Sequence, residues 1–253
     1  MKIYITNYSK NIERLKKLEC DPELIGKNIR WVNEWDQEDL FVKWVKWYTK
    51  SDQTTGHLSN FLKHMWCLND MLKNNIEEAI ILEDDVVFET NWLEKFELTR
   101  KKQQHFKYIK MGCSGQAGLV YQQDKFYLLN NFGGSEAQFV HQDFAYTTLK
   151  NLDFQHSIDI FYVGILFLAK FPGEPCIPVC SQTSLYENIT TTGTNESKID
   201  WKDYVINFPT YKKYIFQDLL AEFEKFKFKK EQFEYEFNER FNYKIECNNF
   251  DLI

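Results

Sequence analysis

The chain has 253 residues, a formal net charge of −6 and a hydrophobic fraction of 43%. This length can bury a full core, as one large domain or as a domain with an appendage. The negative charge argues against nucleic acid as a partner, and the longest apolar run, at 160–169, is too short for a transmembrane segment.

Alternating and helically spaced apolar residues predict strands and helices that follow one another along the chain. In chain order we expect a strand at 2–6, a helix at 11–18, a strand at 29–32, a loop or short helix at 41–48, a helix at 55–74, a strand at 79–82, a helix at 91–100, a strand at 107–111, a hairpin at 118–129, a helix at 144–152 and a strand at 176–179. This order indicates an α/β sheet covered by helices on both faces. Ligands of such sheets bind at the carboxyl ends of the strands.

The composition changes after Pro209. Residues 211–243 are rich in Lys, Glu and Phe and contain no Gly or Pro, which predicts one or two amphipathic helices. We therefore expect a main domain at 1–209 and a C-terminal helical appendage at 210–253 packed on it.

Three adjacent carboxylates stand at the carboxyl end of the predicted strand in AIILEDDVVF, residues 79–88. In extended geometry Glu83 and Asp85 point to one side and Asp84 to the other. Such a group can hold one Mg²⁺ or Mn²⁺ ion, which offsets the mutual repulsion and attracts phosphate. The substrate suggested is a metal-chelated diphosphate, whose departure the metal would assist as a Lewis acid.

The three residues alone leave another interpretation open. A solvated acidic strand end that caps helices or pairs with Lys would have the same sequence. A haloacid-dehalogenase-type phosphatase also carries Asp-x-Asp after a strand, but there it follows the first strand and precedes a Gly-Thr turn. Val86-Val87-Phe88 follows here, which argues against that family.

The segment TTGHLSNFLKHMWCLNDMLKNNIEEAIILEDDVVF, residues 54–88, resembles the signature of glycosyltransferase family 25. Family members have the pattern G-E-I-G-C-x-x-S-H, a helix, and then A-L-I-L-E-D-D-V-x-F. Gly56 matches the first Gly and His64 matches the His, while Ser59, His57 and Lys63 depart from the pattern. The family includes lipooligosaccharide glycosyltransferases and collagen hydroxylysine galactosyltransferases.

The resemblance implies a GT-A-like, Rossmann-type mixed sheet flanked by helices, in an enzyme of the hexosyltransferase class. It also implies a nucleotide-diphosphate sugar as donor, a divalent metal and inversion at the anomeric carbon. IYITNYSKNIERLKKL, residues 3–18, resembles the strand and helix that hold the nucleotide in the family. By this resemblance the residues expected at the donor are Thr6, Asn7, Arg14, Gly56, His64, Glu83 and Asp84.

Each of these roles has a structural alternative. Asp85 is the first candidate for the metal ligand, assisted by Glu83 or Asp84 directly, through water or through the ribose. Asn7 and Arg14 would contact the uracil or the ribose–phosphate, or else Asn7 caps a helix and Arg14 is solvated. His64 would touch the diphosphate or orient an acidic residue, unless it is a satisfied interior histidine. Lys63 is expected in solvent.

An inverting transfer needs a general base that takes the proton of the acceptor hydroxyl. Ser157-Ile158-Asp159 resembles the Pro-Ile-Asp of the family, so Asp159 is the first candidate. Asp143 is the second candidate. Either residue would otherwise be a helix N-cap or an ion-pair partner.

The sequence therefore predicts a metal-dependent inverting glycosyltransferase that moves a hexose from a UDP-sugar to a hydroxyl of a glycan or a collagen-like hydroxylysine, with Mn²⁺ or Mg²⁺ as cofactor. The alternatives are a catalytically inactive binding or scaffold protein, which the departures at His57 and Ser59 would suit, and a nucleotide-sugar hydrolase.

The start of the chain has no signal-peptide pattern, and the composition suits a bacterial or large-virus protein. We therefore expect the protein in the cytoplasm, which would be that of the host cell if the protein is viral.

Overall fold

The computed structural model describes residues 1–102, 104–112, 127–129, 136–170, 174–182, 206–226 and 237, with the backbone alone for 127–129, 174, 175, 178, 181 and 182. Its elements in chain order are β1 (Lys2–Thr6), α1 (Ile12–Glu19), β2 (Ile29–Val32), α2 (Leu40–Thr49), α3 (Thr55–Lys73), β3 (Glu78–Glu83), β4 (Val86–Phe88), α4 (Trp92–Arg100), β5 (Tyr108–Gly112), β6 (Tyr127–Leu129), β7 (Ala137–His141), α5 (Gln142–Leu149), α6 (Ile158–Leu168), β8 (Glu174–Gln182), the 3₁₀ helix η1 (Phe208–Thr210) and α9 (Phe216–Phe226).

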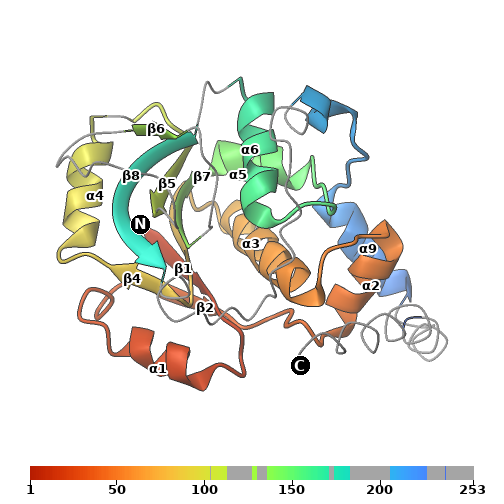
Figure 1. Ribbon diagram of the computed structural model, residues 1–253, viewed down its shortest axis with the longest axis horizontal. Helices are drawn as coiled ribbons and strands as arrows, with labels where there is room; N and C mark the ends of the chain where they lie inside the picture. Colours follow the sequence, from red (N-terminus) through yellow and green to blue (C-terminus); the bar gives the residue numbers. More distant parts are fainter. Residues whose placement is uncertain are drawn as a thin grey trace, which may run out of the picture.

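The described strands form one mixed sheet in the order β2-β1-β3-β7-β5-β8-β4, with β6 paired to β8 (Figure 1). β1 runs parallel to β2 and β3, and β5 runs parallel to β8. β7 lies between β3 and β5 and is antiparallel to both. The amino end of β7 therefore lies at the same edge of the sheet as the carboxyl ends of β1, β3 and β5.

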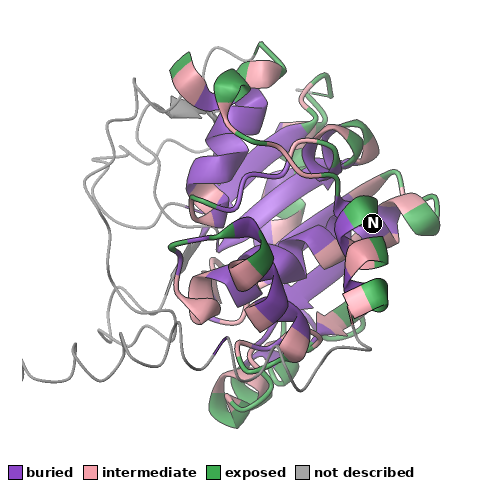
Figure 2. Cartoon of the chain, turned by 90° about the vertical axis from the view of Figure 1, so that its right-hand side faces the viewer, coloured by how far each residue is buried: buried purple, intermediate pink, exposed green. Residues whose placement is uncertain are grey.

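Helices cover both faces of the sheet, because successive residues of each central strand point to opposite sides. In β3, Ala79 and Ile81 join a core cluster formed with α2, α3, α5, α6 and α9. Ile80 and Leu82 join a second cluster with residues of α1 and α4. Figure 2 shows the buried residues concentrated in the sheet and in the helices packed on it.

An N-cap and a regularly spaced apolar face account for α3, the helix that precedes β3 in the chain. Thr54 is the N-cap of α3, because its side chain accepts a hydrogen bond from the backbone N–H of His57 at 3.2 Å. Leu58, Phe61, Leu62 and Met65 are fully buried and face the first core cluster. α3 thus runs from the site edge of the sheet toward the opposite edge, where β3 begins.

Most of the expected elements are confirmed, and 41–48 is a helix, α2. The sequence did not predict β4, β7 or α6. The predicted hairpin at 118–129 lies outside the described residues except for β6, which pairs with β8. Of the predicted C-terminal helices, α9 is described; its Phe223 ring lies 4.8 Å from the Phe41 ring of α2. The division at residue 209 stays a prediction.

The expected GT-A-like α/β fold, a Rossmann-type mixed sheet flanked by helices, is confirmed. Among the described helices, none has the length and apolar character needed to cross a membrane.

Candidate functional site

The carboxyl ends of β1 and β3 meet in register, with Thr6 opposite Glu83. The Thr6 hydroxyl donates to the Leu82 carbonyl at 3.4 Å. Asn7 follows and is 1% exposed, and its Nδ2 donates to Asn33 Oδ1 at 3.3 Å. Asn7 Oδ1 is buried and has no hydrogen-bond partner among the described residues. The edge therefore presents a buried acceptor beside the three predicted carboxylates.

The strand β3 ends at Glu83, and Asp84 and Asp85 form a turn before β4. Arg14 of α1 lies against this acidic turn, defined here as residues 83–85. Its Nη1 is 2.9 Å from Asp84 Oδ1 and 3.6 Å from Asp85 Oδ2. The backbone N–H of Tyr8 also donates to Asp84, at 3.3 Å. Burial raises the pKa of Asp84, and the Arg14 guanidinium partly offsets this rise.

Glu83 is held by α3. Asn60 Nδ2 donates to Glu83 Oε1 at 2.8 Å, and His64 Nε2 lies 3.5 Å from the same oxygen. His64 is fully buried, and its Nδ1 lies 3.3 Å from the Tyr162 hydroxyl of α6. The imidazole therefore lies between the Glu83 carboxylate and the Tyr162 hydroxyl of α6.

Glu136 is a site residue that sequence reasoning missed. It precedes β7, and its carbonyl accepts a hydrogen bond from the Glu83 backbone N–H at 2.8 Å. The side chain is 0% exposed, and neither carboxylate oxygen has a hydrogen-bond partner among the described residues. The pKa of Glu136 is raised to about 7, because burial, together with the charges of Glu83 and Asp85, outweighs the opposite effect of Lys110.

Gly112 at the end of β5 makes room for Glu136. A Cβ on Gly112 would lie 2.5 Å from Glu136 Oε1, closer than any real contact of this kind. The only sequence signal for Glu136 was the alternation in EAQFVH, residues 136–141, which places two polar residues on one face of a buried strand. Without the fold, that pattern does not connect Glu136 with the acidic turn.

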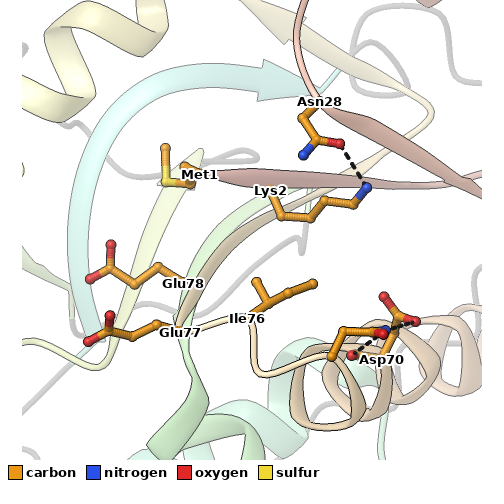
Figure 3. Close-up of a pocket in the computed structure, with 8 residues that line it drawn as sticks. Met1, Lys2, Asn28, Asp70, Ile76, Glu77 and Glu78 are labelled. Atoms are coloured by element: carbon orange, nitrogen blue, oxygen red, sulfur yellow. Dashed lines mark hydrogen bonds between the residues drawn. The ribbon is translucent and has the colours of Figure 1, made fainter.

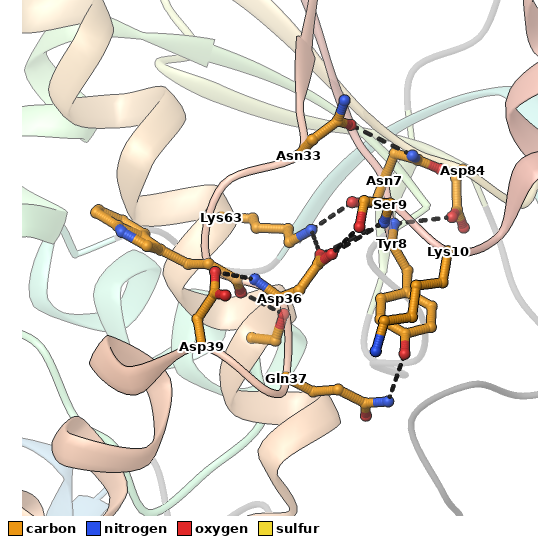
Figure 4. A network of polar contacts seen from close by, with 12 residues as sticks. Asn7, Tyr8, Ser9, Lys10, Asn33, Asp36, Gln37, Asp39, Lys63 and Asp84 are labelled. Carbon is orange, nitrogen blue, oxygen red and sulfur yellow. Dashed lines mark hydrogen bonds and ion pairs between the residues drawn. The ribbon is translucent and has the colours of Figure 1, made fainter.

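Lys63 is not in solvent, so that expectation was wrong. The side chain is buried, and its Nζ forms an ion pair with Asp36 Oδ1 at 2.5 Å and donates to the Asn7 carbonyl (Figure 4). Asp36 also accepts from Ser9 and is positioned by Asp39 Oδ2, which accepts from the Asp36 backbone N–H at 2.8 Å. A buried ammonium is tolerated when it is paired in this way. The network ties the loops after β1 and β2 to α3.

The remaining predicted residues lie in first turns of helices. Gly56 is in the first turn of α3, and Asp159 is in the first turn of α6, where Ser157 Oγ donates to Asp159 Oδ1 at 2.5 Å. The segment before α6 lies against the segment before α3, since Gln53 Nε2 donates to the Phe154 carbonyl at 2.9 Å. Asp159 thus lies at the end of α6 that is near the site edge.

The structure does not bring Asp143 to the acidic turn. Asp143 follows β7, whose last residue His141 pairs with Glu78 at the other end of β3. Its carboxylate lies 3.1 Å from Lys107 Nζ and is largely exposed. Asp143 is therefore not proposed as the general base. A hollow of about 560 Å³ also lies at this opposite edge, lined by residues that include Met1, Lys2, Asp70 and Glu78 (Figure 3).

In the part of the chain that the structure describes, no three His, Cys, Asp or Glu side chains are grouped as a complete metal site. The charges nevertheless suit a divalent cation. The three carboxylates of the acidic turn lie beside one cation, Arg14, which leaves a formal charge of −2. Mg²⁺ and Mn²⁺ commonly bind through one or two carboxylates and complete their coordination with substrate phosphates and water.

Residues 1–159 match the family model described as glycosyltransferase family 25 (LPS biosynthesis protein). The matched stretch is more than half of the chain and runs from β1 to the first turn of α6. It includes Asn7, Arg14, the acidic turn, Glu136 and Asp159. No curated protein matches the chain.

Proposed function

Since the chain belongs to glycosyltransferase family 25 and is a glycosyltransferase, we propose that it moves a hexose from a UDP-sugar to a hydroxyl group with inversion, with Mn²⁺ or Mg²⁺. The acceptor would be a glycan or a collagen-like hydroxylysine. The observation that carries the proposal is the acidic turn, held by Arg14 at the carboxyl edge of the sheet, beside the buried acceptor of Asn7.

Asn7 and Thr6 form the nucleoside end of the proposed donor site. Uracil has one imide N–H, which needs an acceptor when the base is buried. Asn7 Oδ1 is a buried acceptor without a partner among the described residues, which supports this assignment. The Lys63–Asp36 ion pair fixes the Asn7 backbone, because Lys63 Nζ donates to its carbonyl.

The acidic turn forms the diphosphate end of the site. Asp85, with Glu83 or Asp84, would hold the divalent cation. That cation, when bound, acts as a Lewis acid that stabilises the negative charge of the leaving diphosphate. Arg14 holds Asp84 in place through an ion pair, and Asn60 holds Glu83 in place through a hydrogen bond. Carboxylates positioned in advance would hold that cation where the negative charge of the leaving UDP develops.

Asp159 is the proposed general base. An inverting transfer requires a general base on the acceptor side, and the carboxylate of Asp159 lies in the first turn of α6, at the end near the site edge. The hydrogen bond from Ser157 Oγ orients one of its oxygens and leaves the other for the acceptor hydroxyl. Asp159 would take the proton of that hydroxyl as its oxygen attacks the anomeric carbon.

Thermal unfolding with UDP, GDP or CMP, each with and without Mn²⁺, tests the donor site. A ligand at about 100 times its Kd adds roughly 2.7 kcal/mol, or about 5–10 °C for a chain of this size. We expect a shift with UDP that Mn²⁺ enlarges, and Asp85→Asn should lose the Mn²⁺-dependent part. An Asp85→Asn protein with the full Mn²⁺ effect would overturn the metal assignment.

Product analysis then separates transfer from the other chemistries. Incubation with a UDP-hexose should yield a glycosylated acceptor, and Asp159→Asn should bind UDP as the parent does but lose roughly 10²–10⁴-fold in turnover. Release of free sugar in place of a glycosylated product would identify a hydrolase. Absence of both products with every donor and acceptor tried would favour a binding protein.

A further inference from the structure

Glu136 is a buried carboxylate whose hydrogen-bonding capacity is unused within the described part of the protein. It is 0% exposed, and both of its oxygens lack partners there. Burying a carboxylate without hydrogen bonds costs several kcal/mol, so a protein retains one where a function requires it. Neither the predicted nucleotide contacts nor the proposed metal ligands account for this residue.

The surroundings of Glu136 fix where its carboxylate lies. Its backbone carbonyl is bonded to Glu83 N–H, and its side chain lies against Gly112, where no Cβ fits. Glu83 and Asp85 are close enough to raise its pKa by repulsion. Glu136 therefore lies beside the acidic turn, next to the position proposed for the diphosphate.

The chemistry of the donor identifies the group that Glu136 can accept from. A carboxylate is only an acceptor, so its partner must supply O–H or N–H groups. A diphosphate supplies none at neutral pH, and the imide N–H of the uracil and the two ribose hydroxyls belong to the nucleoside end of the site, at Thr6 and Asn7. The hexose follows the diphosphate directly and carries several hydroxyls, each of which can donate.

We propose that Glu136 accepts hydrogen bonds from hydroxyl groups of the donor's hexose and thereby selects the sugar, an inference that rests on the proposed function. Two neighbouring hydroxyls can donate to the two carboxylate oxygens. A sugar that lacks one hydroxyl, or presents it on the other side of the ring, leaves a buried charge unpaired. Such a site discriminates strongly against the wrong substrate.

Titration calorimetry tests this proposal by comparing the ligand affinities of the parent, Glu136→Gln and Glu77→Gln. The ligands are UDP, UDP-galactose, UDP-glucose and UDP-N-acetylglucosamine. Glu77 is a matched control, because its side chain is 74% exposed at the opposite edge of the sheet. In the parent one UDP-hexose should bind more tightly than UDP. Glu136→Gln should bind UDP within about twofold of the parent and lose about 10- to 100-fold for that UDP-hexose, the size of one or two charge-assisted hydrogen bonds.

Donors that lack single hydroxyls give the same test without any substitution. At least one deoxy form of the preferred UDP-hexose should bind the parent more weakly, and Glu136→Gln should not distinguish that form from the complete sugar. If UDP binds but Glu136→Gln and the deoxy donors keep the full affinity, the role of Glu136 is refuted while the donor site stands. If neither UDP nor any UDP-hexose binds the parent, the proposed function fails, and the role of Glu136 fails with it.

Discussion

Replacing Glu136 with Gln should stabilise the metal-free and ligand-free protein, and the gain should grow with pH. The carboxyl has a pKa of about 7 in the folded protein and an ordinary value of 4.5. Between pH 4.5 and about pH 7 the Glu136 carboxyl keeps its proton in the folded protein and loses it in the unfolded chain. The stability of the parent therefore falls as pH rises through this window and levels off above pH 7. The Gln side chain does not titrate in this range, so the stability of the variant does not decrease with pH for this reason.

The size of the effect follows from the two pKa values. One pKa unit corresponds to about 1.4 kcal/mol, so the difference between variant and parent should grow by about 2–3 kcal/mol from pH 5 to pH 8. For a chain of this size that is roughly 5–10 °C in melting temperature.

Thermal unfolding in EDTA at half-unit pH steps measures this difference, and Glu77→Gln controls for the change from carboxylate to amide at an exposed position. If the melting temperatures of parent and Glu136→Gln run parallel from pH 5 to pH 8, Glu136 does not titrate as a buried group. The account of an uncompensated carboxylate would then be wrong.

Two further substitutions test the packing and the charges around the site by urea unfolding. Gly112→Ala places a methyl group 2.5 Å from Glu136 Oε1 and should cost about 1–3 kcal/mol; a change below the error of the measurement would show that the space is not filled as described. Lys63→Met removes the cation from the buried carboxylate of Asp36 and should cost about 3–5 kcal/mol, with part regained in Lys63→Met/Asp36→Asn. A double variant no more stable than the single one would contradict the pairing.

The sequence predicted the elements whose patterns are local and long. α3 has four turns of regular apolar spacing and an N-cap, and the bounds of β1 and β2 are those expected. α6 was missed because it is apolar on nearly all sides, as in a helix buried by its neighbours, so it has no periodicity to detect. β4 is three residues long and gives almost no signal.

The candidate site was predictable where its residues are consecutive. Glu83, Asp84 and Asp85 were found as a group, and the resemblance pointed to Arg14, which lies against two of them. Glu136 was missed because β7 enters between β3 and β5 only in the folded sheet. A partner 53 positions away from Glu83, as Glu136 is, cannot be read from spacing.

The pairing of β4 has a consequence for synthesis of the chain on the ribosome. β4 follows the acidic turn directly, but its described partner is β8, with Val86 opposite Gln182. β8 also pairs with β5. While residues 174–182 are still unmade, both strands lack this neighbour, and open strand edges favour association with other chains. A fragment limited to residues 1–159 would contain the residues of the acidic turn but not the strand that completes the sheet beside it.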